Sequence, residues 1–552
     1  MTTDRLTFTR KNTSVKHIWT DYENMIGQTV TLTGRVYTYR FNGDKDICFI
    51  HLLDGSTVQL IQCVCDRKTC PDTNFTDLWK QVNRGTCVSF VGKIVQSPAK
   101  GQPFELSVFG VRWIGPNMDA ESYPLASRGI ITRETLRQIP HIRHHTQLFT
   151  AIQIIKQRLY QAIHEHMSTL DIGEIQPTLI TTNECESGAC PFTVTTVIPD
   201  DMSISGIPLK DNSTQIDFSK DFFDRRVYLT VSSQLHLEAT VVGTNKDSYC
   251  MTIACRAEQS KGPFHLAEFL MCEWECIDCG LESNMAISET LLKHCFKSIL
   301  NECVPELEYL EKYRLNEIEH DRKIALGELE SRRKTIKKQE YLAQKELKQR
   351  FYDELIDRPS IITRLEKYVS TPFVISTHRE CVALMLKDVT EGKVVFTENP
   401  AFDEDLSKEH ERYITEVLFS GSPVFVRYFP KKIKAFYMPV IDANPTNHMD
   451  NDYVKNDYVE YVDCYDLIFP YVGEVIGGSQ RIDNYDDLVS RMDEINMKKE
   501  PLQWYLDLRK YGSVPHGGAG LGFGRLAIIA TGISQIRDMQ EFPRGYGLTC
   551  YA

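Results

Sequence analysis

The chain has 552 residues, of which 42% are hydrophobic and 25% are charged, as is typical of a globular protein with several cores. This length predicts about three or four domains. The sequence has no signal-peptide core, and no run approaches the roughly 20 apolar residues that span a bilayer, so we expect a cytoplasmic protein without a membrane partner. The net charge of −12 argues against non-specific coating of nucleic acid but leaves room for a local basic groove.

The N-terminal part predicts a polar extension over residues 1–25 and a small β-barrel over residues 26–116. In the second segment, short β-rich runs alternate with turn sequences. Five such strands favour an oligonucleotide-binding (OB) barrel, which binds single-stranded nucleic acid by stacking bases on aromatic side chains. Phe49 is the candidate stacking residue, with Arg40 and Gln59 as polar groups nearby. The pattern alone equally allows Phe49 to be a core residue.

A polar linker is predicted over residues 117–143, and a long helix follows from Leu148 to Thr169, where apolar residues recur at helical spacing. The chain then turns through Pro177 into a strand. Residues 192–222 predict a loop-rich β excursion, and the segment from Tyr228 runs from a strand into a helix.

A charged insertion is predicted at about residues 306–357. Between Glu311 and Arg350, 20 of 40 residues are charged and 12 of these are basic, with a single glycine and no proline. This pattern predicts a solvated insertion, either one long helix or a helical hairpin. A purely structural projection and a basic arm that touches RNA are both compatible with it. Residues 443–463 predict an irregular polar loop.

The 17 cysteines form no two CxxC pairs at zinc-finger spacing. Reduced thiols are expected in a cytoplasmic chain of this size. Two clusters leave zinc binding open as the alternative, namely Cys63, Cys65 and Cys70, and Cys272, Cys276 and Cys279.

The apolar run Ser248–Cys255 predicts a strand, and the stretch Arg256–Glu275 after it predicts a polar loop and a second strand. A guanidinium such as that of Arg256 binds phosphate or carboxylate through two parallel hydrogen bonds. Phe269 offers a face on which a base can stack. An ordinary hairpin with solvated charges is the alternative interpretation.

The C-terminal part carries a second group of polar residues. Asp466 and Glu474 fall on two short predicted strands around a turn, and a glycine-rich run leads into a helix at Arg525. Paired carboxylates near an arginine favour hydrated Mg²⁺ with phosphates. The alternative for the glycine-rich run is a packed strand–helix junction.

Taken together, these stretches resemble the class II aminoacyl-tRNA synthetases of the aspartyl/asparaginyl subgroup, and within it the asparaginyl branch. The three class II motifs occur in order: the long helix with Glu174-Ile-Gln-Pro177, then Arg256-Ala-Glu258 through Phe269, then Gly520 to Arg525. The subgroup signatures SSQLHLEA, SKEHERY, KAFYMP and GEVIGGSQR are also present. Only the N-terminal extension, the charged insertion and the 443–463 loop fall outside the resemblance.

The resemblance implies an α+β protein, with an OB barrel that reads the anticodon and a class II catalytic domain at residues 144–552, whose antiparallel sheet is flanked by helices. It implies ATP-dependent activation of asparagine to asparaginyl-adenylate and transfer to the 3′ end of tRNA(Asn). It also implies a homodimer through the motif 1 helix and the Pro177 region.

The same resemblance assigns the nucleotide site. Arg256 would bridge the α-phosphate and the substrate carboxylate, while Phe269 and Arg525 would sandwich the adenine. Both arginines are therefore the expected catalytic residues. Four further ATP contacts are implied, of which the last two would also hold Mg²⁺: Glu258, His265, Asp466 and Glu474.

The implied asparagine site contains Glu186, Gln234 and Glu273, which would face mainly the ammonium group. Arg481 would donate to the side-chain carbonyl. The aspartyl branch has a lysine where this sequence has Leu237, so the charged side chain of aspartate would lack a partner, which is costly in such a site.

In the barrel, Phe49 would stack on an anticodon base, while Arg40 and Gln59 would read base edges.

Two positions depart from the family pattern. Gly524 stands where an acidic residue usually precedes the motif 3 arginine, and Gly262-Pro-Phe-His265 replaces the usual Thr-x-Arg-His. Two alternatives to the synthetase therefore remain. One is a related ligase that forms an adenylate without tRNA, which the barrel residues argue against. The other is a non-catalytic tRNA-binding protein.

Overall fold

The computed structural model describes residues 12–69, 73–126, 131–182, 190–211, 213–333, 335–441 and 459–548, without the side chains of residues 73–75. Most of the loop expected over residues 443–463 lies outside the described residues. The chain forms two compact units, Met1–Gln157 with Asn301–Ser360, and Arg158–Leu300 with Ile361–Ala552. The charged insertion therefore belongs to the same unit as the barrel, which the sequence did not indicate.

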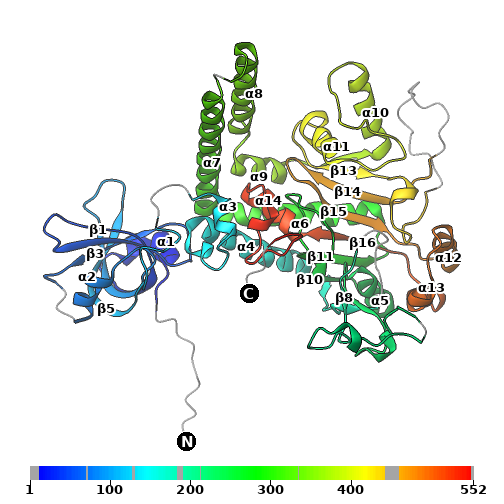
Figure 1. The fold of residues 1–552 in the computed structure, drawn as a ribbon, viewed down its shortest axis with the longest axis horizontal. Helices are drawn as coiled ribbons and strands as arrows, with labels where there is room; N and C mark the ends of the chain where they lie inside the picture. The colour runs from blue at the N-terminus through cyan, green and yellow to red at the C-terminus, as the bar shows by residue number, and fades with distance from the viewer. Residues whose placement is uncertain are drawn as a thin grey trace, which may run out of the picture. The chain divides into compact units, whose positions relative to one another are not determined.

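The first unit contains a closed five-stranded barrel in the order β1-β2-β3-β5-β4, which confirms the predicted OB-type fold (Figure 1). In β2, Cys48, Ile50 and Leu52 are buried, so the intervening Phe49 faces outward. Phe49 is consequently not a residue of the barrel core. The strands are β1 (Thr29–Phe41), β2 (Ile47–Leu53), β3 (Ile61–Asp66), β4 (Cys87–Gln96) and β5 (Phe104–Gly115), with helix α2 (Thr73–Gln81) between β3 and β4.

A helix, α1 (Val15–Met25), packs against this barrel. Its buried residues Val15, Ile18 and Met25 join the barrel core, and the backbone N–H of Val15 donates to Asp54 Oδ2 at 2.8 Å. The predicted polar extension over residues 1–25 is therefore wrong from Val15 onward. Apolar residues recur at helical spacing along this short helix, and the face that they form packs against the barrel.

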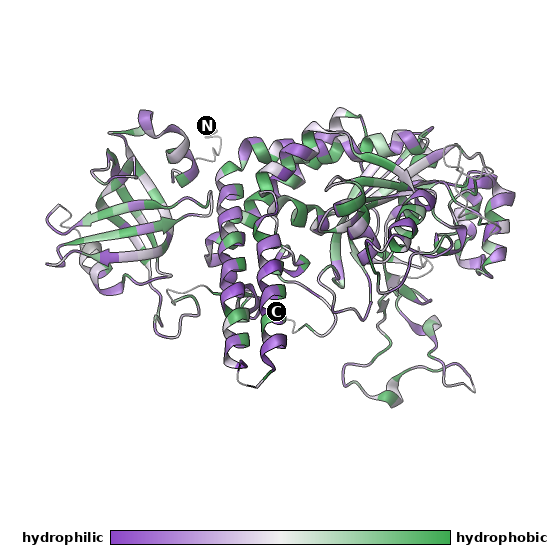
Figure 2. Ribbon diagram, turned by 90° about the horizontal axis from the view of Figure 1, so that it is seen from above, coloured by the Kyte–Doolittle hydropathy of each residue, from purple (hydrophilic) through white to green (hydrophobic). Residues whose placement is uncertain are grey.

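The charged insertion is a helical hairpin of α7 (Val304–Ser331) and α8 (Lys338–Ile356) rather than one long helix. The two helices lie side by side and are largely hydrophilic (Figure 2). Arg322 Nη2 lies 3.0 Å from Asp353 Oδ1, and Arg314 Nη1 donates to the Leu355 carbonyl at 3.0 Å. The predicted linker contains a short helix, α3 (Arg133–Arg137), and precedes the predicted long helix, α4 (Gln147–Thr169).

The second unit is built on an eight-stranded sheet in the order β12-β13-β14-β15-β16-β11-β10-β6 (Figure 1). It is antiparallel except at its two edge pairs. The strands in that order are β12 (Val374–Thr377), β13 (Val424–Arg427), β14 (Cys464–Phe469), β15 (Gly473–Gln480), β16 (His516–Gly522), β11 (Glu268–Ile277), β10 (Ser248–Cys255) and β6 (Gly173–Glu174). A small sheet joins β7 (Ile180–Thr181), β9 (Val227–Leu229) and β8 (Thr193–Val194).

The faces of the large sheet have different roles. On one face, Trp274 Nε1 donates to Asn284 Oδ1 at 2.9 Å, and Ser288 Oγ lies 2.7 Å from the Tyr465 hydroxyl. Helix α6 (Leu281–Glu302) therefore covers that face and leaves the other for a site. The remaining helices are α5 (Gln234–Thr244), α9 (Ile361–Ser370), α10 (His378–Thr390), α11 (Lys408–Tyr413), α12 (Tyr485–Glu494), α13 (Gln503–Lys510) and α14 (Phe523–Thr531). Among the described residues, no helix combines the length and apolar character needed to cross a bilayer.

Candidate active site

A single row of paired residues crosses the open face of the sheet. Asp466 on β14 pairs with Gly477 on β15, Gly477 pairs with Gly520 on β16, and Gly520 pairs with Glu273 on β11. Paired residues of neighbouring strands point to the same face. Two carboxylates thus stand at the ends of the row with two glycines between them. At about 4.8 Å per strand spacing, their backbones are about 14 Å apart, and the glycines leave that floor clear for a ligand.

A β-bulge brings a third carboxylate to this face. Leu467 pairs with Ile476, and Ile468 pairs with Glu474, so Val475 is the extra residue. Without the bulge, Glu474 would alternate onto the opposite face. With it, Glu474 lies on the same face as Asp466. A Cβ on Gly477 would lie 3.2 Å from Glu474 Oε1 and 3.6 Å from Asp466 Oδ1, so both carboxylates converge over this glycine.

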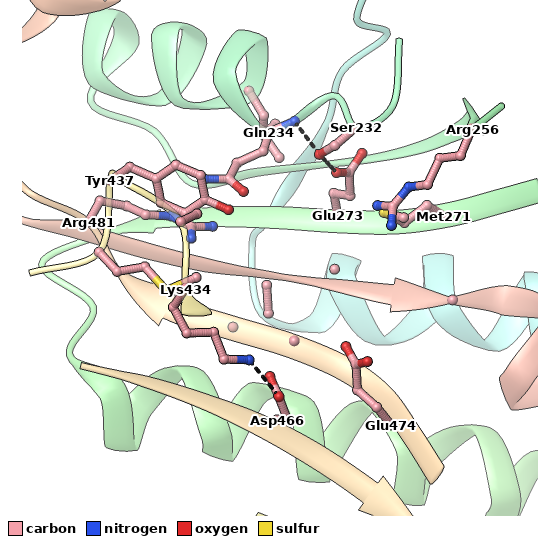
Figure 3. Close-up of a pocket in the computed structure, with 18 of the residues that line it drawn as sticks. Ser232, Gln234, Arg256, Met271, Glu273, Lys434, Tyr437, Asp466, Glu474 and Arg481 are labelled. Carbon is pink, nitrogen blue, oxygen red and sulfur yellow. Dashed lines mark hydrogen bonds and ion pairs between the residues drawn. The ribbon is translucent and has the colours of Figure 1, made fainter. Parts of the chain in front are cut away.

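The row forms the floor of a cavity of about 1190 Å³. Figure 3 shows side chains from both ends of the row pointing into it. Of the predicted catalytic-domain residues, Glu186 lies outside the described part of the chain. The others all line this cavity, namely Gln234, Arg256, Glu258, His265, Phe269, Glu273, Asp466, Glu474, Arg481 and Arg525.

At one end of the cavity, Glu273 is held by donors from the segment that leads into α5. Ser232 Oγ donates to Glu273 Oε1, and the backbone N–H of Ser233 donates to Oε2 at 2.9 Å (Figure 3). The backbone N–H of Gln234 donates to Ser232 Oγ at 3.2 Å. These contacts fix the Glu273 carboxylate in the cavity wall, where it can accept hydrogen bonds from an ammonium group.

Beside it, Arg481 is bound to Glu275 by two parallel hydrogen bonds of 3.0 Å, from Nε and Nη2. Arg481 Nη1 also donates to Ser479 Oγ at 2.6 Å. Both members of the pair line the cavity. Burial and the nearby charge of Glu238 raise the pKa of Glu275 even though Arg481 opposes the shift. A hydrogen-bond donor and an acceptor therefore stand together at this end.

A fully buried network supports these residues from behind. Glu238 Oε2 accepts from Tyr505 OH at 2.7 Å and from Arg509 Nη2 at 2.8 Å, and it lies 3.1 Å from His516 Nε2. Glu238 Oε1 accepts from Gln234 Nε2 at 2.9 Å. Although burial opposes ionisation, Arg509 and His516 hold the pKa of Glu238 well below its usual range. The network therefore fixes the side chain of Gln234.

In the middle of the cavity, the Arg256 guanidinium lies 5.5 Å from the centre of the Phe269 ring. Arg525 lies at the start of α14, donates to the backbone carbonyl of Glu474, and has its Nη1 3.5 Å from Glu474 Oε2. Burial raises the pKa of Glu474, but Arg525 and Lys434 outweigh it, so the net shift is downward. Two arginines and an aromatic ring therefore face the space above the glycine floor.

At the other end, Lys434 Nζ donates to Asp466 Oδ2 at 2.6 Å (Figure 3). Burial and the neighbouring Glu474 charge still raise the pKa of Asp466 to about 7, although Lys434 acts in the opposite direction. The two carboxylates therefore repel one another across Gly477, and a cation between them would relieve that repulsion.

The two departures from the family pattern meet at one residue. A Cβ on Gly524 would lie 3.0 Å from Ile536 Cδ1 and Cγ1, so Ile536 occupies the space beside this glycine. The backbone N–H of Ile536 donates to the Pro263 carbonyl at 3.0 Å. Gly262 is equally crowded, because its Cβ would meet His265 Nδ1 at 2.9 Å. Ile536 thus connects Gly524 to the altered loop, and both departures belong to one packing arrangement.

On the barrel, Arg40 and Phe49 are register partners on β1 and β2. The Arg40 guanidinium lies 4.7 Å from the centre of the Phe49 ring. Arg40 is exposed, and Phe49 and Gln59 are half-buried. Arg40 and Phe49 therefore form a stacked cation–aromatic pair on the outer surface of the barrel.

Several residues of the site were not predicted from the sequence: Ser232, Glu275, Lys434 and Tyr437 line the cavity, and Glu238 lies behind it. Strand alternation could have identified Glu275 from the sequence, because it lies two residues after Glu273 on the same face. Glu238 and Lys434 lie within the signatures SSQLHLEA and KAFYMP, but their roles depend on partners distant in sequence.

Two family models match this chain. The model for class II tRNA synthetases (D, K and N) covers residues 132–545, and that for the OB-fold nucleic acid binding domain covers residues 30–114. The chain belongs to the class II tRNA synthetase family. The cavity above the glycine floor, where the second and third motifs meet, is its candidate active site.

Relatives of this synthetase span nearly its whole length. Proteins named asparagine–tRNA ligase from Porphyromonas gingivalis and Acholeplasma laidlawii are both 34% identical to it, over 520 and 531 residues. These alignments cover 94% and 96% of this chain and 95% and 98% of those proteins. The crystal structure of asparaginyl-tRNA synthetase from Pyrococcus horikoshii complexed with asparaginyl-adenylate has 25% identity and a TM-score of 0.71, covering 96% of this chain and 97% of that one.

Proposed function

We propose that this synthetase is an asparagine–tRNA ligase, which activates asparagine with ATP and transfers it to the 3′ end of tRNA(Asn). The observation that carries the proposal is the row from Glu273 through two glycines to Asp466. It offers an ammonium partner at one end, a carboxylate pair for a metal ion at the other, and Arg256 in the cavity between them.

The amino-acid end of the cavity matches an amide. Glu273 binds the α-ammonium group, with Gln234 beside it. An amide side chain needs one donor and one acceptor, which Arg481 and Glu275 supply together. A carboxylate would instead bring a second negative charge towards Glu275. Leu237 lines this cavity and adds no cation to compensate, so aspartate should be rejected. Glu186, outside the described residues, is proposed as a further asparagine contact.

Catalysis of the first step rests on positioning and charge stabilisation. Arg256 bridges the substrate carboxylate and the α-phosphate, where negative charge builds as the carboxylate attacks and pyrophosphate departs. Phe269 and Arg525 hold the adenine ring between them. Glu258 and His265 contact the nucleotide, with His265 towards the γ-phosphate. The terminal ribose hydroxyl of tRNA then attacks the acyl group of the adenylate.

The carboxylates of Asp466 and Glu474 fit Mg²⁺, because they are oxygen ligands that converge over Gly477 and repel each other. When bound, Mg²⁺ would neutralise charge on the ATP phosphates. Lys434 holds Asp466 in the cavity wall and orients its free oxygen towards the site.

The barrel is proposed to read the anticodon, with Phe49 stacking on a base and Arg40 and Gln59 contacting base edges.

We also propose a homodimer in the cytoplasm, assembled through α4 and the region around Pro177. Three apolar residues on α4, β7 and β10 are exposed in the single chain, namely Tyr160, Ile180 and Ile253. A second copy would remove that apolar surface from water.

ATP–pyrophosphate exchange, followed by charging of tRNA(Asn), tests the function. We expect exchange with asparagine and not with aspartate, and charging of the tRNA. Exchange without charging would favour a ligase that acts without tRNA. No exchange with either amino acid would favour a non-catalytic tRNA-binding protein.

A further inference from the structure

The turn of the helical hairpin is the most basic short segment of the insertion. From Arg332 to Lys338 the sequence reads RRKTIKK, with five basic residues and no acidic one. We call this segment the hairpin tip. Arg332, Arg333, Lys337 and Lys338 are all exposed. Like charges this close repel one another, so the segment is suited to an anionic partner.

The tip is held in a defined shape by its neighbours. The Arg333 guanidinium lies 5.6 Å from the centre of the Tyr341 ring, on the first turns of α8, and its Nη1 donates to Glu330 Oε1 at 3.0 Å. The Tyr341 hydroxyl donates to the same Glu330 carboxylate. Thr335 Oγ1 donates to the Arg332 carbonyl at 2.8 Å. Arg332 and Arg333 therefore lie in a segment held by hydrogen bonds.

The tip also contains the N-terminus of a long helix. Lys337 occupies the N-cap position of α8 with extended backbone angles, and within the described residues no side chain caps this helix. Its first backbone N–H groups and the positive end of its dipole therefore point towards the tip. An oxyanion such as phosphate would accept from these groups while Lys337 and Lys338 neutralise its charge.

The hairpin is attached firmly to the barrel. Glu306 Oε1, near the start of α7, accepts from Thr57 Oγ1 at 2.8 Å and from the Val58 backbone N–H at 3.1 Å. These residues lie immediately before Gln59. Farther along α7, Arg133 and Glu317 form a bidentate pair of 2.7 and 2.9 Å. From Glu306 to Ser331, the helix rises by about 38 Å at 1.5 Å per residue.

We propose that the hairpin tip binds the phosphate backbone of tRNA while the barrel holds the anticodon. This inference rests on the proposed tRNA ligase function. A tRNA is favoured over other polyanions because the hairpin is joined to the loop that carries Gln59 and lies in the same compact unit as the barrel, so that one RNA can contact both. The chain is otherwise acidic, with a net charge of −12, so the tip supplies a localised attraction.

The test removes tip charge without disturbing the turn. The variant Arg332→Gln, Lys337→Gln, Lys338→Gln retains Arg333, which packs on Tyr341. Its matched control removes three cations from the shafts of the helices, as Lys312→Gln, Lys323→Gln, Lys348→Gln. Dissociation constants for tRNA(Asn) are measured between about 50 and 200 mM salt, the range over which phosphate contacts have a strong effect. Asparagine-dependent pyrophosphate exchange without tRNA is measured in parallel.

We expect the tip variant to bind tRNA at least about tenfold more weakly at low salt and to lose about two units of the slope of log K against log salt. Exchange without tRNA should be unchanged, and the shaft variant should bind nearly as the wild type does. Equal effects of the tip and shaft variants, or an unchanged slope in the tip variant, would overturn the inference. The inference would also be overturned if the tip variant lost binding to anionic vesicles but bound tRNA as tightly as the wild type does. Failure of the wild type in exchange would instead overturn the proposed function.

Discussion

The buried network behind the asparagine end gives the most sharply defined prediction, for Glu238→Gln. This substitution keeps the shape of the side chain but removes its charge. Glu238 accepts from four groups, namely Gln234, Tyr505, Arg509 and His516. A glutamine has one oxygen and one NH₂ group, so in either orientation its NH₂ faces a donor.

The expected magnitude follows from burial. Glu238 and the side chain of Arg509 are fully buried, so the substitution leaves Arg509 without its counter-charge. Breaking a buried pair in this way costs about 3–5 kcal/mol. We therefore expect the free energy of unfolding of the catalytic unit to fall by about this amount. KM for asparagine should also rise, because Gln234 loses the acceptor that fixes its side chain.

Denaturant unfolding and steady-state exchange kinetics measure these effects. Tyr505→Phe serves as one comparison, because it removes two hydrogen bonds, one to Glu238 and one from Arg509, without removing a charge, and should cost only about 2 kcal/mol. Asp507→Asn, on the same helix but away from the network, should change stability by about 0.5 kcal/mol or less. A loss below about 1 kcal/mol in Glu238→Gln would refute the reasoning that the network depends on this charge.

Three further substitutions test separate parts of the molecule. Gly524→Ala should destabilise the protein by about 1–3 kcal/mol and raise KM for ATP, because the new Cβ would press on Ile536. Adding Ile536→Val should recover part of this loss, as measured by thermal unfolding. Ser232→Ala removes a donor to Glu273, so KM for asparagine should rise about tenfold while KM for ATP stays constant; equal rises in both would count against its placement. Burial lowers the pKa of His378 to about 4, so the buried neutral imidazole stabilises the fold fully above about pH 6.5. As pH falls towards 4, up to about 3 kcal/mol of the free energy of unfolding is lost. His378→Gln should flatten this part of the curve of stability against pH, and an unchanged curve would contradict the reasoning.

The sequence alone predicts the elements whose signals are local. The barrel strands, the strand–loop–strand around Arg256 and Phe269, and the helix at Arg525 all follow from periodicity and turn residues. The order of the three motifs then identified the candidate residues of the catalytic domain, and the fold places those that are described around one cavity. These predictions succeed because side-chain alternation along a strand already determines which residues share a face.

The features missed from the sequence depend on distant partners. Helix α1 is the exception, since its apolar residues recur at helical spacing and form a local signal: Val15, Ile18, Trp19, Tyr22 and Met25. The bulge at Val475 reverses the face of Glu474, and nothing in its local sequence requires this. The clamp between Glu306 and the Thr57 segment joins residues almost 250 positions apart, so only the folded chain attaches the insertion to the barrel.

The central claim, that this cavity forms an adenylate through Arg256, is tested most directly by asparagine-dependent ATP–pyrophosphate exchange in Arg256→Ala. Because the guanidinium is proposed to stabilise charge that develops in the transition state, we predict loss of exchange by about a hundredfold or more. The unfolding midpoint and the oligomeric state should remain those of the wild type. Exchange retained near the wild-type rate in the folded variant would contradict the account.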